Sequence, residues 1–296
     1  MPSTMNITIF SRGPTLYSTT RLVEAARGRG HVPTVVDHAF CGMSLMGTSA
    51  TIRYKGEDLP RPDVVIPRIG SNITVRGAAL IRQLDVMKVP HTMPAEALLL
   101  ARDKMGSLQL LAGAGIPVPR TSLCFSVHEA RALALREKTF PVVVKLLEST
   151  HGVGVALAAS LNQLTRTVEG FLTLQDRILI QEYIQESKGR DVRALVVGDR
   201  VVAAMERKAT AGEFRANMHR GATARPIDLS AADRDLCIRA ARALGVEVAG
   251  VDLIPSHRGY LLMEVNASPG LEGIENTTGV DVAGAIIEYA ASKVPS

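Results

Sequence analysis

The sequence contains no tryptophan, and aromatic residues make up only 4% of its 296 residues. This scarcity argues against a surface on which the bases of single-stranded nucleic acid stack. The excess of basic over acidic residues is also small, 34 against 29, and it is dispersed along the chain. We therefore expect no direct binding to duplex nucleic acid. A mildly positive surface suits an acidic substrate or an encounter with a ribonucleoprotein, and charge alone does not choose between them.

Long apolar segments and secretion signals are missing as well. No run approaches the roughly 18 apolar residues that a membrane helix requires, and the N-terminus lacks a basic start followed by a long apolar stretch. The three cysteines, Cys41, Cys124 and Cys237, are widely separated and form no CxxC or Cys/His cluster. Such spacing is typical of thiols in a reducing compartment. These absences predict a cytoplasmic protein with no membrane partner.

The length favours about two domains, and the first third of the chain has a pattern of its own. Apolar runs at 6–10, 32–36 and 64–66 read as strands, with a helical pattern between the first two. This alternation predicts a small α/β layer with a parallel sheet. The first loop, SRGPTLYS, contains one glycine, so the GxGxxG pattern of dinucleotide-binding folds is absent.

From about Ala95 the pattern changes to α+β with mixed sheets. One helix is expected to run through Arg102, Asp103 and Lys104 and to stop at the glycines before Pro117. Further apolar runs predict strands at 118–125, 141–147, 155–159 and 177–184. Two hairpins are expected after them, one around Gly198-Asp199 and one that joins 248–254 to 260–266.

The last hairpin carries the most informative polar residues. Glu264 and Asn266 lie two residues apart in an apolar strand, so their side chains share one face. If 248–254 pairs with this strand, Asp252 faces them. Three oxygen-bearing side chains on one ledge suit Mg²⁺ bound to nucleotide phosphates. Any one of them alone also fits a buried polar group with its hydrogen bonds satisfied.

Lys145 lies within the apolar run PVVVKLL, where an unpaired ammonium is costly. It is interpreted as a phosphate ligand, the alternative being an edge-strand lysine that reaches solvent. Gly152 and Gly154 follow in ESTHGVG and would let backbone N–H groups approach phosphate oxygens. An ordinary hairpin turn explains these glycines equally well. No GK[ST] precedes a helix here, so the segment is not a P-loop.

A further apolar strand, RILIQEYI, ends in the polar stretch ESKGRD. At such an exit, backbone groups can bind the edge of a base, and Asp191 can accept hydrogen bonds from ribose hydroxyls. By spacing alone, however, a plain domain linker is the preferred interpretation. Cationic and amide side chains follow, and they either form a solvated face or offset charge on a transferring phosphoryl group. They are Arg193, Arg207, Arg215, Asn217, His219 and Arg220.

Taken in chain order, these residues resemble the ATP-grasp pattern: Lys104, Lys145, the Gly152–Gly154 loop, Gln181-Glu182-Tyr183, Asp191, Asp252 and Glu264-x-Asn266. Several segments resemble the RimK-like branch of that superfamily, namely SRGPTLYS, VIPRIG, ARDKMGSLQLLA, LIQEYI, DVRALVVGDRVVAAMER, FRANMHRG and MEVNASPGLEGIE. The last is the most specific, and matching segments extend from Asn6 to Tyr289. The resemblance implies an α/β and α+β fold. Its expected parts are a pre-ATP-grasp α/β domain with a small parallel sheet (1–94), a central ATP-grasp lobe with a Gly-rich lid loop (95–185) and a C-terminal lobe with the metal site (186–296).

The resemblance also implies roles for single residues. Lys104, Lys145 and the loop glycines Gly152 and Gly154 would contact ATP phosphates, Glu182 and Tyr183 would hold adenine, and Asp191 would hold the ribose. Arg215 and Asn217 would act at the phosphoryl-transfer centre. Asp252, Glu264 and Asn266 would ligate two Mg²⁺ or Mn²⁺ ions, with Glu264 bridging them. The chain departs from the expected EGTQG loop at Ser149 and His151, and it has Ala222 where a second glycine is expected after HRG.

The implied activity is that of a carboxylate–amine ligase that uses ATP. Through an acyl phosphate it would add L-glutamate to the C-terminus of small ribosomal subunit protein six, a ribosomal protein acceptor. Arg215 would stabilise the tetrahedral species and the leaving phosphate. A different acceptor (a small metabolite, a carrier protein or free glutamate) is the alternative, and a non-catalytic nucleotide-binding scaffold is a further one. We also expect a homo-oligomer.

Overall fold

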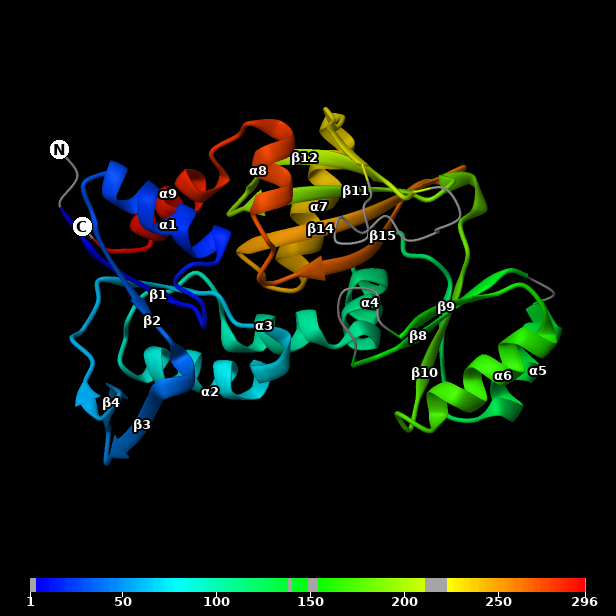
Figure 1. Ribbon diagram of the computed structural model, residues 1–296, viewed down its shortest axis with the longest axis horizontal. Helices are drawn as coiled ribbons and strands as arrows, with labels where there is room; N and C mark the ends of the chain where they lie inside the picture. The colour runs from blue at the N-terminus through cyan, green and yellow to red at the C-terminus, as the bar shows by residue number, and fades with distance from the viewer. Residues whose placement is uncertain (1–3, 138–139, 149–153, 211–222, 296) are drawn as a thin grey trace.

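The structure, a computed structural model, describes residues 4–137, 140–148, 154–210 and 223–295. In this part of the chain four sheets form a row of layered units, with the N-terminal domain at one end and a four-stranded unit at the other (Figure 1). A five-stranded sheet lies between them along the top of the view. Within the same ranges no helix has the length and apolar character needed to cross a membrane.

The N-terminal domain is the predicted parallel α/β layer. Its strands β1 (Asn6–Phe10), β2 (Val32–Val36) and β6 (Val64–Pro67) are ordered β2-β1-β6, and both pairings are parallel. The helices α1 (Tyr17–Gly28) and α2 (Thr74–Val86) accompany this sheet, and α1 buries Leu22 and two alanines. A small antiparallel sheet of β3 (Cys41–Met46), β4 (Ser49–Tyr54) and β5 (Glu57–Asp58) extends from the domain.

The four-stranded unit is antiparallel, with the order β7-β10-β8-β9. Its strands are β7 (Thr121–Cys124), β8 (Val142–Leu146), β9 (Val155–Ala158) and β10 (Ile178–Glu182). The helices α5 (Val127–Glu137) and α6 (Leu161–Leu172) share a core with one face of this sheet (Figure 1). Val142, Val144 and Leu146 belong to that core, so the alternation of a strand directs Lys145 to the opposite face.

The five-stranded sheet has the order β13-β12-β11-β14-β15. Its strands are β11 (Arg190–Val197), β12 (Arg200–Lys208), β13 (Thr223–Pro226), β14 (Val248–Ser256) and β15 (Gly259–Asn266). Both predicted hairpins, β11–β12 and β14–β15, are confirmed, and Gly198 adopts the positive φ of 61° that the first turn requires. Helix α7 (Ala231–Ala243) packs on one face, and α8 (Glu272–Thr278) and α9 (Val282–Ser292) close the chain.

The helix expected through Arg102, Asp103 and Lys104 is wrong, because the chain breaks at Asp103. Helix α3 (Ala95–Arg102) ends there, α4 (Lys104–Gly113) begins there, and Asp103 is extended, with φ −84° and ψ 100°. Its Oδ1 accepts hydrogen bonds from the backbone N–H groups of Met105 (3.1 Å) and Gly106 (2.9 Å). This is an N-cap, which offsets the loss of helix continuity. The break places Arg102 and Lys104 on different helices.

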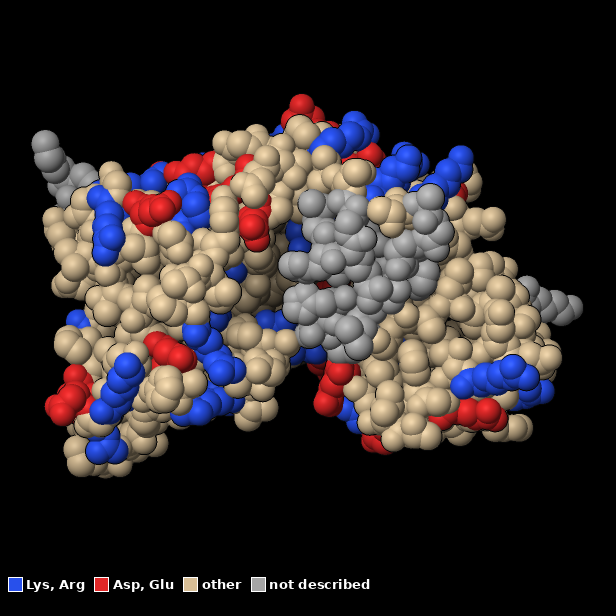
Figure 2. Space-filling model, in the orientation of Figure 1, with Lys and Arg blue, Asp and Glu red and all other residues tan. Residues whose placement is uncertain are grey.

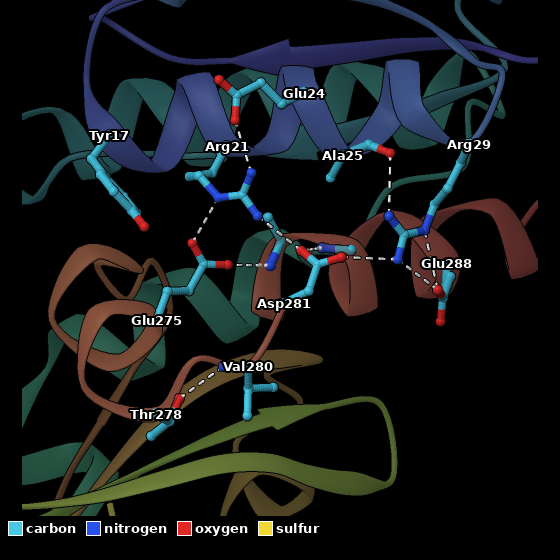
Figure 3. A network of polar contacts seen from close by, with 12 residues as sticks. Tyr17, Arg21, Glu24, Ala25, Arg29, Glu275, Thr278, Val280, Asp281 and Glu288 are labelled. Atoms are coloured by element: carbon cyan, nitrogen blue, oxygen red, sulfur yellow. Dashed lines mark hydrogen bonds and ion pairs between the residues drawn. The ribbon is translucent and has the colours of Figure 1, made fainter. Parts of the chain in front are cut away.

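Ion pairs hold the N-terminal domain against the C-terminal helices (Figure 3). Arg21 on α1 donates to the buried carboxylate of Glu275 (3.1 Å) and to Asp281 (3.1 Å). Glu275 also accepts from the backbone N–H of Ala283 at 2.8 Å. Arg29 adds one hydrogen bond to Asp281 and two to Glu288. The final Glu of the MEVNASPGLEGIE motif therefore braces two parts of the fold.

Candidate active site

The predicted ledge lies on the face of the five-stranded sheet opposite α7. Asp252 is the Cα partner of Glu264 in the β14–β15 pairing, and Gly250 is the partner of Asn266. The expectation that Asp252 faces Glu264 is thus confirmed by the register. A bulge follows Asp252, and Asn266 Nδ2 lies 3.5 Å from Asp252 Oδ2. The ledge is a short array of oxygen donors at one end of a hairpin.

Two arginines engage Asp252, one from the adjacent strand β11 and one from β12, the strand beyond it. Arg193 lies directly opposite Asp252 on β11 and donates to both of its oxygens, at 2.7 and 2.6 Å. Arg207 Nη2 approaches within 3.3 Å. Burial opposes ionisation of this carboxyl, but the two guanidinium groups outweigh it and lower its pKa. The sequence left two interpretations of Arg193 and Arg207 open, a solvated face or a role at the phosphoryl centre. In the structure both arginines are counterions of Asp252 on the ledge.

Asp191 belongs to the same polar group. Its two oxygens accept from Arg207 at 2.6 and 2.9 Å, and its side chain is only 14% exposed. Burial raises the pKa of this carboxyl, while the charge of Arg207 opposes the rise. Its role as a ribose ligand stays a prediction, and that role would require Asp191 to share its oxygens with Arg207.

The two lysines of the predicted phosphate site face the ledge. Lys145 lies on β8, which has a neighbour on each side, so the edge-strand alternative is wrong. Its Nζ donates to Gln181 Oε1 at 2.7 Å, and Gln181 in turn donates to Thr121. Lys104 Nζ donates to the carbonyl of Leu147. Burial lowers the pKa of both ammonium groups, that of Lys145 to about 8.

Glu264 is the carboxylate that the lysines share. Its charge opposes the fall in the pKa of Lys104 and of Lys145, although they come from different elements. Glu264 is exposed and makes no hydrogen bond or ion pair with another described residue. An ammonium has three donors, and Lys145 uses one of them on Gln181. The two lysines and Glu264 thus form one cluster of opposite charges beside the ledge.

The strand exit at the end of β10 is braced by Glu182. Its backbone N–H donates to Arg120 O (2.9 Å), and its Oε1 accepts from the N–H of Arg120 (2.8 Å) and from Arg258 (2.5 Å). Tyr183 is half-buried directly after it. The contacts fix the path of the backbone between the two sheets, where an adenine site is predicted.

Several predicted residues cannot be placed. Gly152, Arg215 and Asn217 lie outside the described residues, as do the departures at Ser149, His151 and Ala222. Gly154 is described: its φ is +71°, and an added Cβ would lie 2.6 Å from the side chain of Leu146. This glycine is needed for the turn into β9, and its contact with phosphate stays a prediction.

The donors at the ledge suit a divalent cation that prefers oxygen. Two carboxylates and one amide are the ligands that Mg²⁺ and Mn²⁺ take. Among the described ranges no group of three or more His, Cys, Asp or Glu side chains could hold a metal, because the third donor here is the amide of Asn266. Glu264 offers a carboxylate that no described side chain occupies, so the residues present fit such an ion.

The sequence pattern missed two arginines that lie near this site. Arg102 ends α3, and the charge of Glu264 acts on it. Arg68 follows β6 and donates to the carbonyl of Pro269 at 2.5 Å. In Figure 2, basic atoms lie in and beside a hollow between the N-terminal domain and the four-stranded unit. One feature of the sequence could have indicated Arg68: it directly follows the apolar run VVIP, at the end of a predicted parallel strand, and ligands commonly bind at such strand ends.

Two family models match the chain. One, described as the RimK-like ATP-grasp domain, matches residues 101–290, and the other, described as the RimK PreATP-grasp domain, matches residues 5–98. The probable α-L-glutamate ligase of Enterobacter sp. (strain 638) is 48% identical over 285 residues, which cover 96% of this chain and 95% of that protein. The ribosomal protein bS6–L-glutamate ligase of Salmonella schwarzengrund (strain CVM19633) has the same identity and coverage.

Solved structures show the same fold. The ATP-grasp ligase PsnB, complexed with a phosphomimetic variant of its minimal precursor, Mg and ADP, gives a TM-score of 0.76 at 21% identity, with all of both chains covered. The RimK domain protein ATP-grasp from Sphaerobacter thermophilus DSM 20745 gives a TM-score of 0.70 at 25% identity, over 96% of this chain and 99% of that one. The predicted fold class is therefore confirmed.

Proposed function

This chain belongs to the RimK-like ATP-grasp family, and we propose that it is an ATP-dependent ligase that adds L-glutamate to the C-terminus of ribosomal protein bS6. A relative named for that activity is 48% identical over nearly the whole length of both proteins. The observation that carries the proposal is the placement of Lys104 and Lys145 around Glu264, beside the oxygen donors of the ledge. That arrangement suits a nucleotide triphosphate and its cations.

The reaction proceeds in two displacements. An oxygen of the acceptor carboxylate attacks the γ-phosphorus of ATP, the bridging P–O bond breaks, and ADP leaves. The amine of glutamate then attacks the acyl carbon of the resulting acyl phosphate. The bond between that carbon and the phosphate oxygen breaks, phosphate leaves, and the nitrogen loses a proton to give the amide. No side-chain nucleophile is required, so the chain contributes positioning and charge.

Each predicted residue has a role in this scheme. Lys104 and Lys145 bind the phosphates and supply charge to the γ-phosphoryl group. The remaining roles are Gly152 and Gly154 at the phosphates, Glu182 and Tyr183 at adenine, Asp191 at the ribose, and Arg215 with Asn217 at the phosphoryl-transfer centre. Asp252, Glu264 and Asn266 would hold two Mg²⁺ or Mn²⁺ ions. Such ions, when bound, neutralise developing charge on the phosphate oxygens.

The test combines phosphate release with intact mass. The protein is incubated with ATP, Mg²⁺ and each amino acid in turn, with and without purified bS6. We expect phosphate release that depends on glutamate, with successive glutamyl additions to bS6. Additions to free glutamate, a peptide or another protein alone would replace bS6 as the acceptor. ATP turnover without glutamate, or no glutamyl product at all, would refute the ligase.

A matched pair of variants tests the ledge. Glu264→Ala is expected to abolish turnover, whereas Glu272→Ala is expected to leave it unchanged, because Glu272 is an exposed residue of the same motif on α8. Full activity in Glu264→Ala would refute the metal assignment.

We also propose that the chain self-associates. Phe40, Leu45 and Met46 are 58%, 65% and 69% exposed on and beside the small sheet of the N-terminal domain, and exposed apolar groups of this kind favour association. Light scattering should give a molar mass above that of one chain, and Leu45→Lys should lower it.

A further inference from the structure

Two guanidinium groups meet where the N-terminal domain faces the loop after the ledge. Arg68 follows β6 and donates to Pro269 O, three residues after Asn266. Arg102 at the end of α3 donates to Ile69 O at 2.9 Å, and Ile69 is the neighbour of Arg68. Burial, and after it the charge of Arg102, together lower the pKa of Arg68 to about 10. The two cations are thus close enough to repel each other in a poorly hydrated place.

Neither arginine has a carboxylate partner among the described residues. Their hydrogen bonds go to backbone carbonyls, and Arg102 Nε is buried with no acceptor in the described part of the chain. Ser268 Oγ, next to the carbonyl that Arg68 holds, is also buried without a partner there. Buried donors and charges are normally satisfied. Such a pair of guanidiniums without a carboxylate indicates an anion that the described part of the chain does not supply.

The position of the pair indicates which anion. Arg68 stands at the carboxyl end of a parallel strand, an edge at which ligands bind. Glu264 of the ledge is the carboxylate whose charge acts on Arg102, so the pair borders the centre at which the acyl phosphate would form. The triphosphate already has Lys104 and Lys145 on the side of the four-stranded unit. A planar guanidinium matches a carboxylate in particular, because it donates two parallel hydrogen bonds.

We propose that Arg68 and Arg102 bind one carboxylate of the incoming L-glutamate and direct its amine toward the acyl phosphate. This proposal rests on the ligase function, and it assigns to the pair the selection of a dicarboxylic amino acid. Either the side-chain or the α-carboxylate has the required chemistry. Glutamine, which lacks the first, and isoglutamine, which lacks the second, distinguish the two sources.

The test compares Arg102→Gln and Arg68→Lys with Arg53→Gln, a control in which an exposed arginine on β4 loses the same charge. The KM for glutamate is measured at saturating ATP and acceptor. In Arg102→Gln it is expected to rise about tenfold or more, since a charge-assisted hydrogen bond is lost. The KM for ATP and the thermal shift caused by ADP with Mg²⁺ should stay at wild-type values. Arg53→Gln should match the wild type throughout.

The analogues give a second readout that a structural role would not change. Wild-type protein should prefer glutamate over one of the two amides, and Arg102→Gln should lose most of that preference. Arg68→Lys keeps a donor for Pro269 O, so it preserves the loop while removing the planar fork. If Arg102→Gln does not fold, Arg68→Lys alone decides the question.

Different results overturn the two proposals. If wild-type protein shows no turnover with glutamate, the ligase function fails. If wild-type protein uses glutamate and folded variants keep its KM and its preference over both amides, only the carboxylate site is refuted. Equal rises in the KM for glutamate and for ATP would also refute it, because they indicate a general disturbance of the cleft.

Discussion

Replacing Lys145 with methionine is expected to stabilise the nucleotide-free fold and to weaken nucleotide binding. Burial lowers the pKa of this lysine from 10.5 to about 8, even though Glu264 opposes the change. At neutral pH that fall corresponds to about 3 kcal/mol against the charged form, an upper limit for a side chain that is only half-buried. Methionine removes the charge but leaves Gln181 Oε1 without its donor, at a cost of about 2 kcal/mol. The expected net gain is about 1 kcal/mol.

The gain should depend on pH in a defined direction. Because the pKa of Lys145 is lower in the folded than in the unfolded chain, the unfolded chain binds more protons between about pH 8 and pH 10.5. The destabilisation by Lys145 is therefore complete below pH 8 and is relieved as the pH rises through that window. Denaturant unfolding in the presence of a metal chelator, at pH 7 and at pH 10, measures it. The advantage of Lys145→Met should be present at pH 7 and should reverse at pH 10, where less than about 1 kcal/mol of the charge penalty remains against the cost of the unpaired Gln181 oxygen.

Lys145→Met is expected to bind nucleotide more weakly than the wild type does, although its nucleotide-free fold is more stable at pH 7. ADP with Mg²⁺ should raise the thermal midpoint of the wild type and of Lys208→Met, in which an exposed lysine at the end of β12 is lost. It should raise that of Lys145→Met much less. A Lys145→Met protein that is less stable than wild type at both pH values would refute the reasoning about burial. A variant that binds ADP as the wild type does would refute the role at the phosphates.

Three further substitutions test the frame around the site. Asp103→Ala should lower the free energy of unfolding by about 1 kcal/mol because it removes the cap of α4, whereas Asp103→Asn should retain most of it; an equal loss in both would exclude capping as the cause. Glu275→Gln removes the charge that Arg21 and the N–H of Ala283 contact, and about 2 kcal/mol should be lost in denaturant unfolding. Arg193→Gln leaves a buried carboxylate with a weaker partner and should cost about 3 kcal/mol; a loss at pH 7 no larger than at pH 4 would contradict this.

The hairpins were predictable because their signals are local. The runs 248–254 and 260–266 are mostly apolar and a short polar segment joins them, which predicted their pairing, and the register places Asp252 opposite Glu264. The break between α3 and α4 was not predictable in the same way. Its flanks are good helix formers, and only the two hydrogen bonds to Asp103 decide between one helix and two.

The contacts across elements could not be predicted from spacing. Arg193 reaches Asp252 because β11 pairs with β14, and this register joins residues 59 positions apart. Arg68 and Arg102 come together because the ends of β6 and α3 lie near each other. Neither arginine interrupts the apolar pattern of its own element, so no sign of the contact is visible in the sequence. A family resemblance indicated which residues matter at the ledge, but it was silent on what holds them there. Pairing between distant strands is the physical information that a local pattern lacks.

The charge of the whole site restricts how cations reach the ledge. Among the described residues of the site, cationic side chains outnumber carboxylates: Arg68, Arg102, Lys104, Lys145, Arg193 and Arg207 stand against Asp191, Asp252, Glu264 and, near Lys104, Glu148. A lone divalent cation would meet repulsion from the lysines and would compete with Arg193 for Asp252. A cation that arrives on nucleotide phosphates brings its own negative charge, which the same lysines attract. The site is therefore built to accept metal and nucleotide together, and the arginines on Asp252 hold the ledge in shape until they arrive.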